Sequence, residues 1–139
     1  MPPTTILPTL ALYLLPCAIQ DFRSRRVSNW LTLPAFFAAW PLALWLGGEE
    51  RLFFTFAVFA GCWLAWGMKS MGAADGKLAT IIAAVSPAAL GVGVLLLVMG
   101  FVGLRLRRGE ATSLPAVVGF YAGTVGLVLV EGIRILWFY

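Results

Sequence analysis

The chain contains only two aspartates, Asp21 and Asp75, and each lies at the end of an otherwise apolar segment, close to basic residues. An acidic side chain near lipid is energetically expensive, so its presence there favours a functional role. The chain has no histidine. Two carboxyl groups without histidine favour one chemistry before most others, in which a pair of aspartates shares a proton and activates water.

The composition is typical of a membrane protein. Apolar residues make up 61% of the 139 residues and charged residues only 12%, about half the charged share of an ordinary soluble domain. This predicts a single membrane-embedded domain over residues 1–139. The net charge of +4 does not indicate nucleic-acid binding, because the basic residues lie between apolar segments, as they do in loops beside membrane helices.

The two cysteines, Cys17 and Cys62, lie inside apolar segments and do not have the paired spacing of a zinc site. We expect them to pack as small apolar residues. No motif for a metal or a cofactor is present in the sequence, so the expected chemistry depends on the two carboxyl groups alone.

The apolar segments that must position these carboxyl groups predict an all-α fold. Lipid cannot hydrogen-bond an open backbone, so we expect a polytopic membrane helix bundle with about six transmembrane helices. The expected helical segments are about Thr5 to Gln20, Trp30 to Leu46, Leu52 to Met68, a fourth from Lys77, Ala88 to Leu104, and Pro115 to Trp137. In the last segment, Gly119 and Gly123 form a G-x-x-x-G step that predicts close helix packing.

The fourth segment is the shortest, because Ser86 and Pro87 interrupt it and a proline disfavours continuation of a helix. Two short helices and one kinked crossing are both compatible with residues 77–104. Two helices put eight Lys and Arg residues on one side of the membrane and two on the other, whereas one crossing gives five and five. The positive-inside rule therefore favours two helices, with both aspartates at the cytoplasmic face of a multi-pass cell-membrane protein.

The first stretch that could take part in catalysis begins at Asp21 and continues through a short basic turn to Pro34. Ser28 or Asn29 offers a side-chain oxygen that caps the following helix. The alternative role for Asp21 is a structural ion pair with Arg25 or Arg26.

The second stretch surrounds Asp75 with small residues, Gly72, Ala74 and Gly76. Small residues let another backbone, such as an extended substrate, approach the carboxyl group closely. Lys77 follows, and it either helps to bind the substrate backbone or extends its ammonium group to the interface. The alternative role for Asp75 is to stabilise a helix N-terminus through its charge.

Together these stretches resemble the motifs of the type IV prepilin peptidases and the archaeal preflagellin peptidases, which are intramembrane aspartyl proteases. Their first motif is an aspartate, a short basic turn, then isoleucine-proline-asparagine, any residue and leucine-threonine. This chain has Asp21 and then Val27–Thr32, which reads VSNWLT. Their second motif is glycine, any residue, glycine, aspartate, any residue and lysine, and this chain has GAADGK at Gly72–Lys77.

The resemblance implies that Asp21 and Asp75 are the catalytic pair and that Gly72, Ala74, Gly76 and Lys77 line the substrate site. It implies cleavage of a type IV prepilin or pilin-like membrane protein, between its leader and its hydrophobic helix, at the cytoplasmic interface. The length matches a short, peptidase-only member.

This chain departs from the family pattern at two positions. Ser28 replaces a proline, and Ala74 replaces the second glycine of the second motif. The change at Ala74 leaves open a catalytically impaired pilus-assembly subunit of the same fold. A second alternative is a proton-coupled transporter subunit with the acids as relay groups, against which the acids lie at the ends of spans and no internal repeat is visible. The sequence does not determine the oligomeric state or which aspartate is the base.

Overall fold

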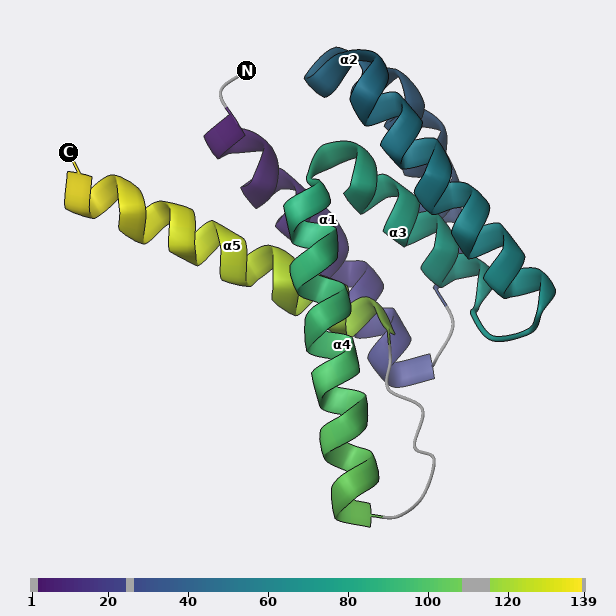
Figure 1. The fold of residues 1–139 in the computed structure, drawn as a ribbon. Coiled ribbons are helices and arrows are strands. Elements are labelled where there is room, and N and C mark those ends of the chain that lie inside the picture. The colour runs from purple at the N-terminus through teal and green to yellow at the C-terminus, as the bar shows by residue number, and fades with distance from the viewer. Residues whose placement is uncertain (1–2, 25–26, 109–115, 139) are drawn as a thin grey trace.

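The computed structural model describes residues 3–24, 27–108 and 116–138. Within these ranges the chain forms five helices and no strand (Figure 1): α1 (Pro3–Ser24), α2 (Asn29–Gly67), α3 (Ala73–Val85), α4 (Pro87–Arg108) and α5 (Ala116–Phe138). The predicted all-α fold is therefore confirmed for the described part of the chain.

Helix α2 is a hairpin of two helical arms. The backbone at Gly47 and Gly48 is not helical, and Gly48 has a φ of +64°, a left-handed conformation that glycine adopts without steric cost. Ring contacts hold the arms together, since the rings of Phe36 and Trp40 on the first arm each lie 5.6 Å from the ring of Phe59 on the second. The two arms correspond to the second and third predicted segments.

The chain turns back at Ser86, and α3 and α4 diverge from this point like the arms of a V (Figure 1). Pro87 is the first residue of α4, where its missing N–H is not needed, and Ser86 Oγ accepts a hydrogen bond from Ala89 N–H at 3.2 Å. The end of α3 is stabilised by Arg51, whose Nη1 donates to the Val85 carbonyl at 2.8 Å. The reversal favours two helices over one kinked crossing.

Helix α3 begins earlier than the sequence indicated. Its first residue is Ala73 rather than Lys77, so Asp75 lies in the first helical turn and not in the preceding loop. Gly72 occupies the N-cap position and makes no side-chain capping bond, so the sequence carries no clear signal for this helix start. Helix α1 likewise continues past Asp21 to Ser24, which puts Asp21 in its last turns.

The glycine step predicted in the last segment packs α5 against α4. A Cβ atom on Gly123 would lie 2.6 Å from the Cα of Gly93, and one on Gly119 would overlap the side chain of Leu97. Only glycine permits this approach of the two helices. Helix α5 also packs along α1, which brings its first residues to the part of α1 that carries Asp21.

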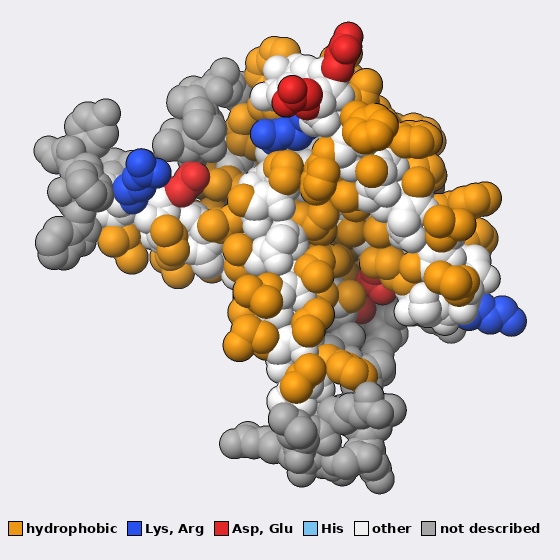
Figure 2. Space-filling view, viewed as in Figure 1, with side chains coloured by type: hydrophobic (Ala, Val, Ile, Leu, Met, Phe, Trp, Pro, Cys, Tyr) orange, Lys and Arg blue, Asp and Glu red, His pale blue; other side chains and the backbone are white. Residues whose placement is uncertain are grey.

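The face of the molecule in Figure 2 is largely apolar, whereas several threonine hydroxyl groups are buried. Trp30 is 90% exposed and Phe22 is 75% exposed. The buried Thr55, Thr80 and Thr124 each donate to the carbonyl one turn earlier, at 2.8 to 2.9 Å, so these three hydroxyl groups are hydrogen-bonded within their own helices. Apolar groups outside and satisfied polar groups inside suit a lipid environment.

Two helical stretches in the described part of the chain are long and apolar enough to cross a membrane by length and composition, Asn29–Gly67 and Ala116–Arg134. Pro87–Gly103 is a shorter apolar helix. The number of about six membrane-spanning helices therefore stays a prediction.

Candidate active site

Asp21 is buried between α1 and α5. The residue is only 7% exposed. Its Oδ2 accepts a hydrogen bond from the backbone N–H of Val117 at 3.2 Å. Val117 is the second residue of α5, so this N–H has no partner within its own helix. Asp21 therefore supplies the acceptor that the start of α5 lacks.

Asp75 occupies the first turn of α3 and is less enclosed than Asp21. A Cβ atom on Gly72 would lie 2.9 Å from Asp75 Oδ2, a closer approach than side-chain atoms normally allow. The absence of a side chain at Gly72 thus leaves the space that the Asp75 carboxyl group occupies.

The charges of the two aspartates interact, although the residues are far apart in the sequence. The pKa of the Asp75 carboxyl is raised from its ordinary value of 3.8 to about 6, first by burial and then by the negative charge of Asp21, while a backbone hydrogen bond at Gly72 opposes this. Figure 2 shows acidic side-chain surface in a hollow beside α4, apart from the acidic groups at the edges of the molecule. Packing of α1, α3 and α5 thus brings the two carboxyl groups within range of each other's charge, which disfavours ionisation of both at once.

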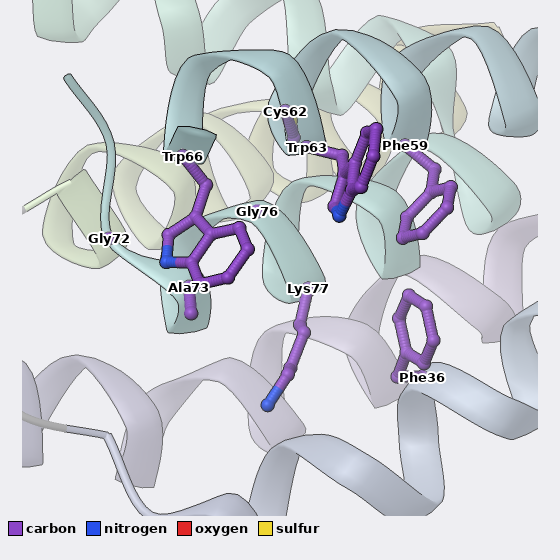
Figure 3. A pocket seen from close by; sticks show the side chains of 9 residues that line it. All are labelled: Phe36, Phe59, Cys62, Trp63, Trp66, Gly72, Ala73, Gly76 and Lys77. Atoms are coloured by element: carbon purple, nitrogen blue, oxygen red, sulfur yellow. The ribbon is translucent and has the colours of Figure 1, made fainter. Parts of the chain in front are cut away.

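An open cavity of about 250 Å³ lies at the first turn of α3, between α3 and the two arms of α2 (Figure 3), and Asp75 is not among its lining residues. Aromatic and small residues form most of its wall. The lining residues are Phe36, Phe59, Cys62, Trp63, Trp66, Gly72, Ala73, Gly76 and Lys77. The cavity has the character of a site for apolar groups.

Lys77 connects the two sequence stretches. Its side chain extends from α3 toward the start of α2 (Figure 3), and Nζ donates a hydrogen bond to Asn29 Oδ1 at 2.9 Å. The lysine of the second stretch thereby holds the asparagine of the first, and Lys77 itself lines the cavity.

These features belong to a known class of membrane protease. The model of the type IV leader peptidase family matches residues 9–107, which is more than half of the chain and includes both aspartates. The chain belongs to the type IV leader peptidase family. No curated protein and no solved structure gives a match. Family membership supports a leader-peptidase-like protease, and the apolar helices together with the family indicate a membrane protein.

The matched region ends before α5, so the helix that contacts Asp21 lies outside it. The roles of Asp21 and Asp75 as catalytic residues stay predictions. The structure adds that each carboxyl group has a backbone hydrogen bond, Asp21 from Val117 and Asp75 at Gly72.

Ser28, the first departure from the family motif, has two uses in this structure. Its Oγ accepts a hydrogen bond from Trp30 N–H at 3.3 Å and caps α2, as predicted. Its own N–H donates to Gln20 Oε1 at 3.1 Å, a bond that a proline cannot make because it has no N–H. Ser28 therefore links the start of α2 to Gln20 of α1 through a contact that a proline could not make.

The four residues predicted to bind substrate divide into two groups. Gly72, Gly76 and Lys77 line the cavity, and Ala74 is not among its lining residues. Gly76 also has a packing role, since a Cβ atom there would lie 3.2 Å from Cys62 Cβ on α2. Glycine at position 76 thus allows α3 to pack closely on α2, whatever it contributes to binding.

Several site residues were not predicted from the sequence. Val117 contributes only its backbone N–H, so no side-chain pattern identifies it. Trp63 and Trp66 lie on the second arm of α2 and reach the cavity only because that arm folds back. The alternative partners proposed for Asp21, Arg25 and Arg26, lie outside the described residues.

Proposed function

We propose that the chain is an intramembrane aspartyl endopeptidase that removes the leader peptide of a type IV prepilin or pilin-like protein at the cytoplasmic face of the cell membrane. The observation that carries this proposal is the pairing of Asp21 with Asp75 across α1 and α3, close enough for one charge to raise the pKa of the other carboxyl. The family match supports the reaction class.

Hydrolysis by such a pair needs one ionised and one protonated carboxyl group. The ionised carboxylate takes a proton from water, and the resulting hydroxide attacks the scissile carbonyl carbon. The protonated carboxyl group gives its proton to the carbonyl oxygen, which stabilises the tetrahedral intermediate. The first acid then protonates the leaving nitrogen, the C–N bond breaks, and the second carboxylate recovers a proton from the intermediate. Both groups return to their starting states.

The surroundings of Asp75 suit a substrate that is itself embedded in the membrane. The cavity at the first turn of α3, the turn that carries Asp75, is open and has mainly apolar and aromatic walls, so an apolar peptide segment loses little by entering it. Gly72 and Gly76 leave room for a substrate backbone, and Lys77 offers N–H donors at the edge. A basic leader followed by an apolar helix fits this arrangement, with the cut at their junction.

The test is processing of a prepilin from the same genome, expressed together with the enzyme and followed by the mass of the pilin in isolated membranes. Asp21→Asn and Asp75→Asn are each expected to leave the precursor intact, and Glu131→Gln serves as a matched control because Glu131 lines a different cavity. Full processing by either aspartate variant, or no processing by the unmodified chain, would refute the proposal. The second result would favour the impaired assembly subunit.

A further inference from the structure

The N-terminus of α5 acts on Asp21 and not on the other member of the pair. Val117 N–H donates to Asp21 Oδ2 at 3.2 Å, inside the bundle. A hydrogen bond from a backbone N–H at a helix N-terminus favours the ionised form of a carboxyl group, because both the bond and the helix dipole stabilise negative charge.

The surroundings of Asp75 have the opposite net effect, because they favour the protonated form of its carboxyl group. Asp75 also lies at a helix N-terminus and receives a backbone hydrogen bond at Gly72, but burial and the facing charge of Asp21 outweigh these contacts and raise its pKa. The titratable groups that interact with it from neighbouring helices are Asp21 of α1 and Cys62 of α2. On its own helix, Lys77 is directed to Asn29.

We propose that Asp21 is the ionised member that takes the proton from water, that Asp75 carries the proton of the pair, and that the Val117 N–H is the positioning group that fixes these roles. This assignment rests on the proposed function. It makes α5, which lies beyond the family match, part of the catalytic arrangement through a single backbone atom.

The first test removes that N–H. Val117→Pro deletes the donor at a position in the first helical turn, where proline is tolerated. Two control variants separate the other effects: Val117→Ala removes the buried side chain but keeps the N–H, and Ala116→Pro adds a proline one residue earlier while Val117 N–H remains. The purified variants are assayed in detergent with a synthetic peptide that has a basic leader and an apolar segment of roughly 20 residues.

Val117→Pro is expected to lower kcat by roughly 10- to 100-fold, since a hydrogen bond to a charged group is lost, with little change in KM. The acid limb of its pH–rate profile is expected at higher pH, because a hydrogen bond that stabilises a carboxylate is lost. The control variants are expected to keep the limb of the unmodified enzyme. An unchanged limb in Val117→Pro would overturn the positioning role, whether or not kcat falls.

The second test locates the proton without activity. Infrared titration follows the protonated carboxyl band, which in the unmodified protein is expected to disappear with a midpoint near pH 6. Asp75→Asn is expected to abolish this transition, and Asp21→Asn is expected to keep it at lower pH because the neighbouring charge is gone. A transition that survives in Asp75→Asn and is lost in Asp21→Asn would overturn the assignment.

These outcomes are distinct from failure of the proposed function. If Asp21→Asn and Asp75→Asn both cleave the peptide normally, the protease proposal fails. If both are inactive while Val117→Pro has the kcat and pH profile of the unmodified enzyme, the protease proposal stands and the role of Val117 fails.

Discussion

Asp21 and Asp75 lie in the same region of the bundle, but different helices enclose them. Asp21 is buried between α1 and α5 and is hydrogen-bonded to a backbone N–H. Asp75 lies in the first turn of α3, and its neighbours in that turn line an open cavity together with aromatic residues of α2. Each is an aspartate at the end of an apolar segment, and the sequence alone gives no reason to assign them different roles.

The comparison shows that the helix packed against an acid determines what the acid can do. Asp21 is held by a backbone donor at the start of α5, which suits a group that must stay aligned. Asp75 fits beside Gly72, where a side chain would collide with its carboxyl group, and it is more exposed than Asp21, which suits a group that contacts the substrate carbonyl. The predictions below alter the two surroundings separately.

The largest effect is expected from filling the space beside Asp75. Gly72→Ala introduces a Cβ atom 2.9 Å from Asp75 Oδ2, and the carboxyl group must move aside. Displacement of a catalytic group by about 1 Å can cost roughly 100-fold in rate, so we expect a comparable fall in kcat for peptide cleavage. Gly67→Ala is the control, because a Cβ atom there meets nothing within 4 Å. Equal kcat values for the two variants would contradict the role of Gly72.

A smaller effect, on stability, is expected from separating α5 from α4. Gly123→Ala brings a Cβ atom to 2.6 Å from the Gly93 backbone, which cannot move as a side chain can. We expect a loss of about 1–3 kcal/mol, as for other overpacked interiors, seen as a lower Tm in detergent. Gly126→Ala, where a Cβ atom has open space, is expected to keep its Tm. The packing account fails if both variants melt together.

Replacing Asp75 itself is expected to stabilise the protein in a defined pH range. The pKa of Asp75 is raised from 3.8 to about 6 in the folded state, so the unmodified protein loses stability as pH rises through this interval and Asp75 ionises. Asp75→Asn avoids that loss, so above pH 6 its free energy of unfolding is expected to exceed that of the unmodified protein by about 1–2 kcal/mol, after allowance for solvent screening. The Tm difference between the two proteins is expected at pH 7.5 and not at pH 4. A difference that is independent of pH would contradict the raised pKa.

The smallest effect is expected at the link between the two motifs. Lys77→Met and Asn29→Ala each remove the 2.9 Å hydrogen bond, which is worth about 0.5–1.5 kcal/mol. We expect a rise of KM by roughly 2- to 10-fold in each single variant. The double variant is expected to be no worse than either single variant, because the same bond is lost. Strictly additive effects would indicate that the two residues act separately.

The sequence predicted the features that depend on local signals. Ser86 and Pro87 mark the turn between α3 and α4 because proline ends one helix and begins another. Ser28 was predicted as a possible cap, and Gly119 and Gly123 as a close-packing step, from residue type and spacing alone. Both aspartates were identified because charged groups are rare in so apolar a chain.

The sequence did not predict the features that arise only when helices meet. The start of α3 was placed too late because Gly72 offers no side-chain cap. The contact of Val117 with Asp21 uses a backbone N–H, which every residue except proline carries, so residue type gives no signal. The link between Lys77 and Asn29 depends on how α3 packs against α2, and periodicity within one helix carries no information about that.

The central claim is that packing brings residues 21 and 75 into one site, and thiol cross-linking in native membranes tests it without reference to activity. Cys17 and Cys62 are first replaced by Ala, and the pair Asp21→Cys with Asp75→Cys is then treated with a short bifunctional maleimide. The chain is then cut between the two cysteines. We predict that the two fragments stay joined for this pair, while the fragments of the control pair Asp21→Cys with Glu131→Cys separate. Equal cross-linking of both pairs, or none of the first, would contradict the account.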